Sequence, residues 1–166
     1  MSPKAYVKVV DLLPDQHQVN LRIKVIAQIM FGEVDDSNKS TKNVEQPQTT
    51  NTEDLNTPKK KPEPVFDLSK IEVAEFLVGD SSGCIILKAI NDQISLLQPQ
   101  TCVFIHNARV EMYRGFMRIV VDQNTNAEIK PFGEATDDKE DDIQPNLEKN
   151  CSLTEYQYVP HVVLNE

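Results

Sequence analysis

Apolar and polar residues alternate at every second position along several stretches of the chain, a period that is typical of β-strands. The pattern predicts five strands, over residues 19–31, 71–78, 84–90, 101–113 and 116–121. Short turns that contain glycine, at residues 79–83 and 114–115, join the second strand to the third and the fourth strand to the fifth. These short connections predict two antiparallel hairpins.

A short helix is predicted between the third and fourth strands. Asn91 and Asp92 are favourable helix caps ahead of residues 93–97, and Pro99 ends the helical stretch. Five strands with one short helix between the third and the fourth have the element order of an OB-fold barrel. The sequence therefore predicts an all-β protein built as a five-stranded OB-fold barrel.

Two stretches lack this alternation. Residues 32–66 are rich in Asn, Thr, Gln, Lys and Pro, so burial would not offset the entropy of folding them. We expect a long disordered insertion there, between strands one and two. An acidic linker follows the barrel. The predicted organisation is an N-terminal segment with strand one (1–31), the insertion (32–66), the remainder of the barrel (67–132), the acidic linker (133–150) and a closing segment (151–166).

Charge is concentrated near the C-terminal end. The 166 residues carry a formal net charge of −9, and residues 134–166 hold nine acidic residues against two basic ones. Two interpretations of the acidic stretch at 134–142 stay open: a solubilising linker, or a flexible anion that occupies a basic surface of the barrel. Beyond it, Leu153, Tyr156, Tyr158 and Val162 restore the alternation, and we expect them to anchor the closing segment.

Composition bounds the class of protein. Only 39% of the residues are hydrophobic, against about 45–50% in an average globular domain, so the core must be confined to part of the chain. No apolar run approaches the roughly 20 residues of a membrane span, and the first ten residues do not resemble a signal peptide. We expect an intracellular protein, nuclear or cytoplasmic, with no membrane partner.

Metal, redox and catalytic chemistry are not indicated. Cys84, Cys102 and Cys151 lie far apart, as do the three histidines, so the sequence predicts neither a metal site nor a cofactor. Residues 79–83 match G-x-S-x-G, but a nucleophile elbow joins a strand to a helix, whereas this turn precedes another strand. We therefore expect no catalytic residue and no enzyme.

The stretch from residue 73 to residue 122 resembles a known family. Its motifs are the hairpin LVGDSSG, the connection AINDQISLLQP and the hairpin IHNARVEMYRGFMRIVVD. They resemble single-OB-fold proteins of the SOSS-B type and the small plant OB-fold-like nucleic-acid-binding proteins. Upstream VVDLLPDQHQVNLRIKV and downstream NCSLTEYQYV resemble the opening and closing segments of that family. The resemblance implies binding of single-stranded nucleic acid.

The chain departs from that family where bases would stack. Animal members carry four aromatic residues on the open barrel face, and the matching positions here are Ile90, Arg109, Tyr113 and Val120. Only Tyr113 keeps a ring, and the chain contains no tryptophan. Since each stacked base contributes about 1–3 kcal/mol, this loss predicts weaker binding than in those relatives.

Strand periodicity nevertheless predicts one surface that can contact nucleic acid. The predicted nucleic-acid-binding residues are Lys88, Ile90, Arg109, Tyr113, Phe116 and Arg118. We expect this surface to bind single-stranded DNA or RNA with low sequence specificity. Two alternatives stay open: ordinary solvated side chains on a barrel, and a scaffold subunit whose barrel docks a protein partner and binds nucleic acid weakly or not at all.

Overall fold

Six strands and three short helical segments make up the part of the chain that the structure describes. The computed structural model describes residues 5–35, 70–132 and 143–160. The strands are β1 (Val19–Asp35), β2 (Lys70–Asp80), β3 (Gly83–Ile90), β4 (Cys102–Tyr113), β5 (Phe116–Val120) and β6 (Glu128–Pro131). The helical segments are η1 (Val9–Asp11), α1 (Asp92–Ser95) and η3 (Cys151–Leu153).

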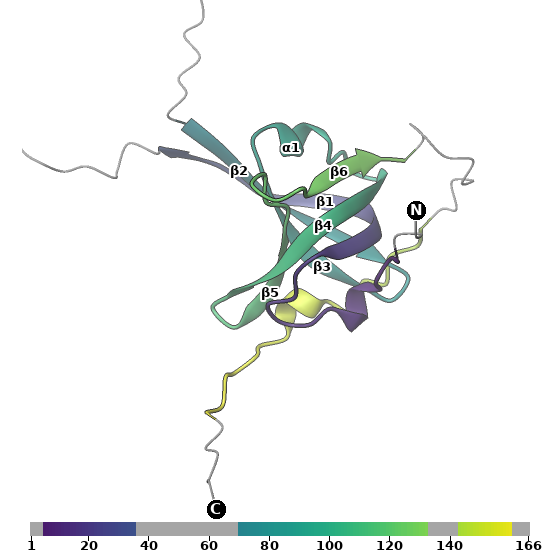
Figure 1. The fold of residues 1–166 in the computed structure, drawn as a ribbon. Helices are drawn as coiled ribbons and strands as arrows, with labels where there is room; N and C mark the ends of the chain where they lie inside the picture. The colour runs from purple at the N-terminus through teal and green to yellow at the C-terminus, as the bar shows by residue number, and fades with distance from the viewer. Residues whose placement is uncertain (1–4, 36–69, 133–142, 161–166) are drawn as a thin grey trace, which may run out of the picture.

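The sheet closes into a barrel (Figure 1). Its order is β1-β2-β3-β5-β4, and β4 pairs back onto β1. The pairing of β3 with β5 is parallel, while the other ladders are antiparallel. β6 adds to the free edge of β4. The predicted all-β, five-stranded OB-fold barrel with one short helix between β3 and β4 is confirmed.

β1 is long enough to serve two parts of the barrel. Its first half pairs with β4 and its second half with β2, and irregularities in the pairing at residues 25–27 and 28–30 bend it between the two. The β2–β3 ladder ends at the pair Val73–Ile90. Beyond that pair, β1 and β2 continue as a two-stranded ribbon that projects from the barrel (Figure 1).

Alternation decides which side chains fill the barrel. In β3, Ile85, Leu87 and Ala89 are fully buried, while the residues between them are half-buried. Val110, Met117 and Ile119 bury the inward side of β4 and β5 in the same way. Gln93 attaches α1 to the barrel. Its side chain accepts from the Ile90 N–H at 3.1 Å and donates to the Val121 carbonyl at 2.8 Å.

Several predicted boundaries are wrong. Residues 32–35, assigned to the insertion, belong to β1, because they pair in register with residues 70–73 of β2. The helix spans Asp92–Ser95 rather than 93–97, and it ends before Pro99 is reached. Asn91 does not cap it through its side chain, because that oxygen accepts instead from the Glu72 N–H of β2 at 3.0 Å. The rest of the expected insertion (36–66) and the whole acidic stretch (134–142) lie outside the described residues.

The closing segment returns to the barrel. Of the predicted anchors, Tyr158 donates its hydroxyl to the Asp15 carboxylate at 2.6 Å, and the Tyr156 N–H donates to the Gly115 carbonyl at 2.7 Å. Leu153 and Tyr158 are 75% and 72% exposed. The buried residue is Ser152, whose hydroxyl donates to the Met117 carbonyl at 2.6 Å and accepts from the Ile86 N–H at 2.9 Å. Val162 lies outside the described residues. The hydrogen bonds of Ser152 therefore attach this segment between β3 and β5, and the half-buried Cys151 packs against the core beside it. No helix in the described part of the chain combines the length and apolarity of a membrane span.

Candidate nucleic-acid interface

The outward sides of β2, β3, β5 and the distal half of β4 form one continuous surface, which we call the open face. Pairing places Glu75, Lys88, Val120 and Arg109 in one row across these strands, and Leu77, Ile86, Arg118 and Glu111 in the next. Val73, Ile90, Tyr113 and Phe116 complete it. All six predicted contact residues belong to this face: Lys88, Ile90, Arg109, Tyr113, Phe116 and Arg118.

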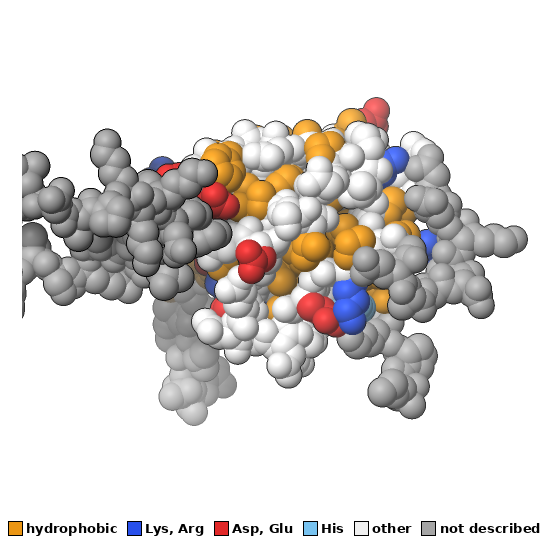
Figure 2. All heavy atoms as spheres, turned by 90° about the horizontal axis from the view of Figure 1, so that it is seen from above, with side chains coloured by type: hydrophobic (Ala, Val, Ile, Leu, Met, Phe, Trp, Pro, Cys, Tyr) orange, Lys and Arg blue, Asp and Glu red, His pale blue; other side chains and the backbone are white. Residues whose placement is uncertain are grey.

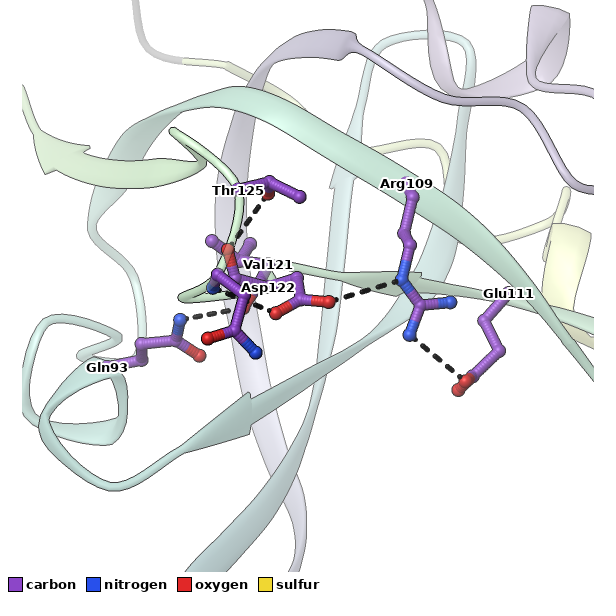
Figure 3. A network of polar contacts seen from close by, with 7 residues as sticks. Gln93, Arg109, Glu111, Val121, Asp122 and Thr125 are labelled. Carbon is purple, nitrogen blue, oxygen red and sulfur yellow. Dashed lines mark hydrogen bonds and ion pairs between the residues drawn. The ribbon is translucent and has the colours of Figure 1, made fainter.

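Acidic partners neutralise two of the three cations on the open face. The Arg118 guanidinium forms an ion pair with Glu75, and both side chains are largely buried. The Arg109 guanidinium lies 3.3 Å from Glu111 and 4.0 Å from Asp122 (Figure 3). Lys88 has no ion-pair partner among the described residues. Three cations therefore face three carboxylates, so the open face is close to neutral.

The aromatic side chains of the open face lie at its β4–β5 end. Tyr113 and Phe116 are partners across the Arg114-Gly115 turn, and Tyr113 is 45% exposed. The Arg118 guanidinium carbon lies 4.4 Å from the centre of the Tyr113 ring, and that of Arg114 lies 5.3 Å from it. Cation–π contact holds these groups together. A base that stacks here meets a Tyr–Arg platform rather than an isolated ring.

Two hollows meet at Arg109. One, of about 200 Å³, lies on the open face and is lined by Lys88, Ile90, Arg109 and residues 120–122. The other, of about 320 Å³, is lined by His17, Gln18, Arg109, Asn107 and the β5–β6 turn. The carboxylate of Asp122 orders that turn by accepting from the Asn124 N–H at 3.0 Å (Figure 3). The smaller hollow therefore lies beside Lys88, which has no ion-pair partner among the described residues, and the larger one continues from Arg109 toward the β5–β6 turn.

Sequence reasoning missed the acidic residues of this face. Glu75 lies two positions from Val73 and Leu77, so the strand period does place it outward. Its contact with Arg118 depends on how β2, β3 and β5 are aligned, and a single-strand pattern contains no such information.

Seen from the side of α1 and β6, apolar side chains gather in the middle of the surface, with charged groups of both signs scattered among them (Figure 2).

The G-x-S-x-G turn links two strands, as predicted, and its polar groups are used within the fold. The Asp80 carboxylate accepts from the N–H groups of Val9, Ser82 and Gly83 and from the Ser82 hydroxyl. A side chain on Gly79 would approach the Gly83 carbonyl at 2.7 Å, which explains the glycine. Asp80 thus fixes the turn and holds η1 against it.

The thiols lie in apolar or part-buried positions. The three cysteines are free, and burial raises the pKa of the Cys84 thiol and that of the Cys151 thiol. Among the described residues, no group of three or more His, Cys, Asp or Glu side chains is arranged to hold a metal ion.

Comparison with known proteins agrees with this architecture. A family model described as "Single-stranded DNA binding protein Ssb-like, OB fold" matches residues 12–129. The chain belongs to this family. A curated Arabidopsis thaliana protein, described as uncharacterized, is 36% identical over 87 residues, which are 52% of this chain and 52% of that protein. This chain therefore aligns with about half the length of that relative.

A solved structure supports the same fold. The solution structure of a hypothetical protein from Arabidopsis thaliana superimposes with a TM-score of 0.57 and 27% sequence identity. The alignment covers 98% of this chain and 94% of that one. The described part of the chain therefore has the OB fold of the Ssb-like family.

Proposed function

We propose that this protein binds single-stranded DNA or RNA across its open face, with little sequence preference. In this proposal Lys88 attracts a phosphate group, while Tyr113 and Arg118 offer a flat platform for a base. Ile90 and Phe116 supply apolar contact beside them, and Arg109 contacts the backbone where the two hollows meet.

The single observation that carries the proposal is the convergence of these six side chains on one surface of an Ssb-like barrel. Arginine suits such a surface because its planar group both stacks on bases and donates to phosphate oxygens. The ion pairs reduce this capacity, since each phosphate must compete with Glu75, Glu111 or Asp122. Binding is therefore expected to be weaker than that of a fully aromatic, basic OB face.

A protein-docking function is the second candidate, and the charge balance favours it. The open face alternates half-buried apolar side chains with ion pairs that are already satisfied, and protein interfaces combine such elements. In this alternative the barrel is a scaffold subunit, and the same residues contact a protein partner. Neither candidate requires a cofactor or a catalytic residue.

Fluorescence anisotropy with labelled oligo(dT) and oligo(U) separates the two candidates. Nucleic-acid binding predicts micromolar affinity at low salt for both probes. The logarithm of the binding constant should fall linearly with the logarithm of the salt concentration. The absence of binding to either probe at low salt would reject the proposal and leave the docking function.

A further inference from the structure

An arginine outside the open face lacks the partners that its counterparts have. Arg22 points outward from β1 and is not ion-paired within the described part of the chain. Its Nε and Nη2 atoms are buried and make no hydrogen bond. Arg109 and Arg118 both have carboxylates. Buried, charged donors without acceptors are costly, so the Arg22 guanidinium is prepared for an anion that the described residues do not supply.

Aromatic packing fixes the position of this guanidinium. Its carbon lies 5.0 Å from the centre of the Phe132 ring, which is stacked on Phe104 at 4.1 Å. Tyr6 packs on Phe104 at 5.5 Å, yet its side chain stays 44% exposed. Arg22 and the Tyr6 ring therefore stand on one rigid aromatic support, and the outer part of the ring remains accessible.

Both groups line a cavity of about 480 Å³, which we call the Arg22 pocket. Lys8 and Ser81 add an ammonium group and a hydroxyl group to its lining. Asp80 also lines it, but the Asp80 carboxylate is 3% exposed and accepts from the four donors named above. The volume is in the usual range of small-ligand sites, about 300–1,000 Å³. No residue lines both this pocket and the open face.

We infer that the Arg22 pocket binds a nucleotide, with its phosphate on Arg22 and Lys8 and its base on the Tyr6 ring. Guanidinium and ammonium groups are the usual protein ligands of phosphate, and an exposed aromatic ring stacks on any base. The nucleotide is either free or the 5′-phosphorylated end of a strand, because both present the same phosphate and base. This site is additional to the open face and does not depend on it.

NMR titration of the ¹⁵N-labelled full chain tests the inference. We expect thymidine 5′-monophosphate, added to about 10 mM, to shift the amide signals of Tyr6, Val7, Lys8 and Ser81. Thymidine, which lacks the phosphate, should leave them in place, and inorganic phosphate should move them only at severalfold higher concentration. Equal effects of inorganic phosphate and the nucleotide would overturn the role of the base.

Variants assign the shifts to the two proposed contacts. Arg22→Gln should abolish them, and Tyr6→Leu, which keeps an apolar side chain on Phe104, should weaken binding about fivefold or more. Lys130→Gln is the matched control, because Lys130 is a basic residue of neighbouring β6 whose partner is Glu128 at 2.9 Å. Retention of full binding in folded Arg22→Gln, or in Tyr6→Leu, would overturn the inference.

Oligonucleotides with and without a 5′-phosphate distinguish the two sources of the ligand. If the pocket takes strand ends, the phosphorylated oligo(dT) shifts the pocket signals at lower concentration than the monophosphate does. If it takes free nucleotides, the monophosphate alone shifts them. Movement of open-face signals without pocket signals would reject this inference and leave the proposed function. Movement of pocket signals without open-face signals would support this inference and reject the proposed function.

Discussion

At the scale of single residues, the contribution of a side chain to the stability of the fold follows from its partners more than from its polarity. Ser152 joins β3 to β5 with one hydroxyl, whereas its apolar neighbour Leu153 extends into solvent. Ser152→Ala leaves the Ile86 N–H without its acceptor, so we expect a loss of about 1–3 kcal/mol in the free energy of unfolding. Leu153→Ala should change it by less than about 0.5 kcal/mol.

Urea unfolding of the two variants measures this difference. An equal loss in both, or a larger loss in Leu153→Ala, would mean that the closing segment is held by apolar contact after all.

Tyr113 and Lys88 separate stacking from charge on the open face. Tyr113→Ala removes the ring beneath Arg118, so we expect oligonucleotide binding to weaken by about 1–3 kcal/mol with an unchanged salt slope. Lys88→Ala should instead reduce the slope by about 0.7, the value of one phosphate contact on a single strand.

Anisotropy titrations at several salt concentrations give both quantities. Tyr158→Ala serves as the control, because Tyr158 is an exposed tyrosine that lies outside the open face and donates to Asp15. If all three variants bind like the parent protein, the open face is not the interface.

At the scale of elements, register explains both the successes and the failures of sequence reasoning. The period of two correctly assigned inward and outward residues in β3 and β5, because burial imposes it within each strand. It could not place Glu75 beside Arg118, since that contact depends on the alignment of three strands. β6 was missed because its four residues, EIKP, contain one buried apolar side chain and end in proline.

The Arg22 pocket was equally invisible in the sequence. Arg22, Tyr6 and Ser81 belong to separate segments, and only the closure of β1 onto β4 and the docking of η1 bring them together. Asn91 illustrates the same limit, because a residue that is typical of a helix cap finds a better partner on β2.

The ribbon of β1 and β2 allows a direct test of the insertion. Asp35 and Lys70 are register partners, so an Asn-Gly turn can replace residues 36–69 and close the ribbon as a two-residue hairpin. We expect the melting temperature to stay within a few degrees of that of the parent protein. The barrel core contains no residue of the ribbon, and loop length alters stability only weakly. A fall of about 10 °C in calorimetry would show that the replaced residues stabilise the barrel.

At the scale of the whole molecule, charge pairing limits what the barrel can bind. Glu75→Gln removes the carboxylate from Arg118, and oligonucleotide affinity should then rise by up to about fivefold at low salt. Glu148→Gln changes the net charge equally at an exposed position outside the open face, so it serves as the control. Equal gains in both variants would indicate general electrostatics, and no gain in Glu75→Gln would favour protein docking.

An NMR titration of the ¹⁵N-labelled protein with oligo(dT) and oligo(U) at low salt shows directly whether single-stranded nucleic acid binds across the open face. Binding across the open face predicts that the largest amide shifts occur in the rows around Lys88 and Arg118 and at the Tyr113–Phe116 end. These shifts should diminish as salt is added. Unchanged spectra at low salt, or shifts confined to residues outside the open face, would show that the open face does not bind single-stranded nucleic acid.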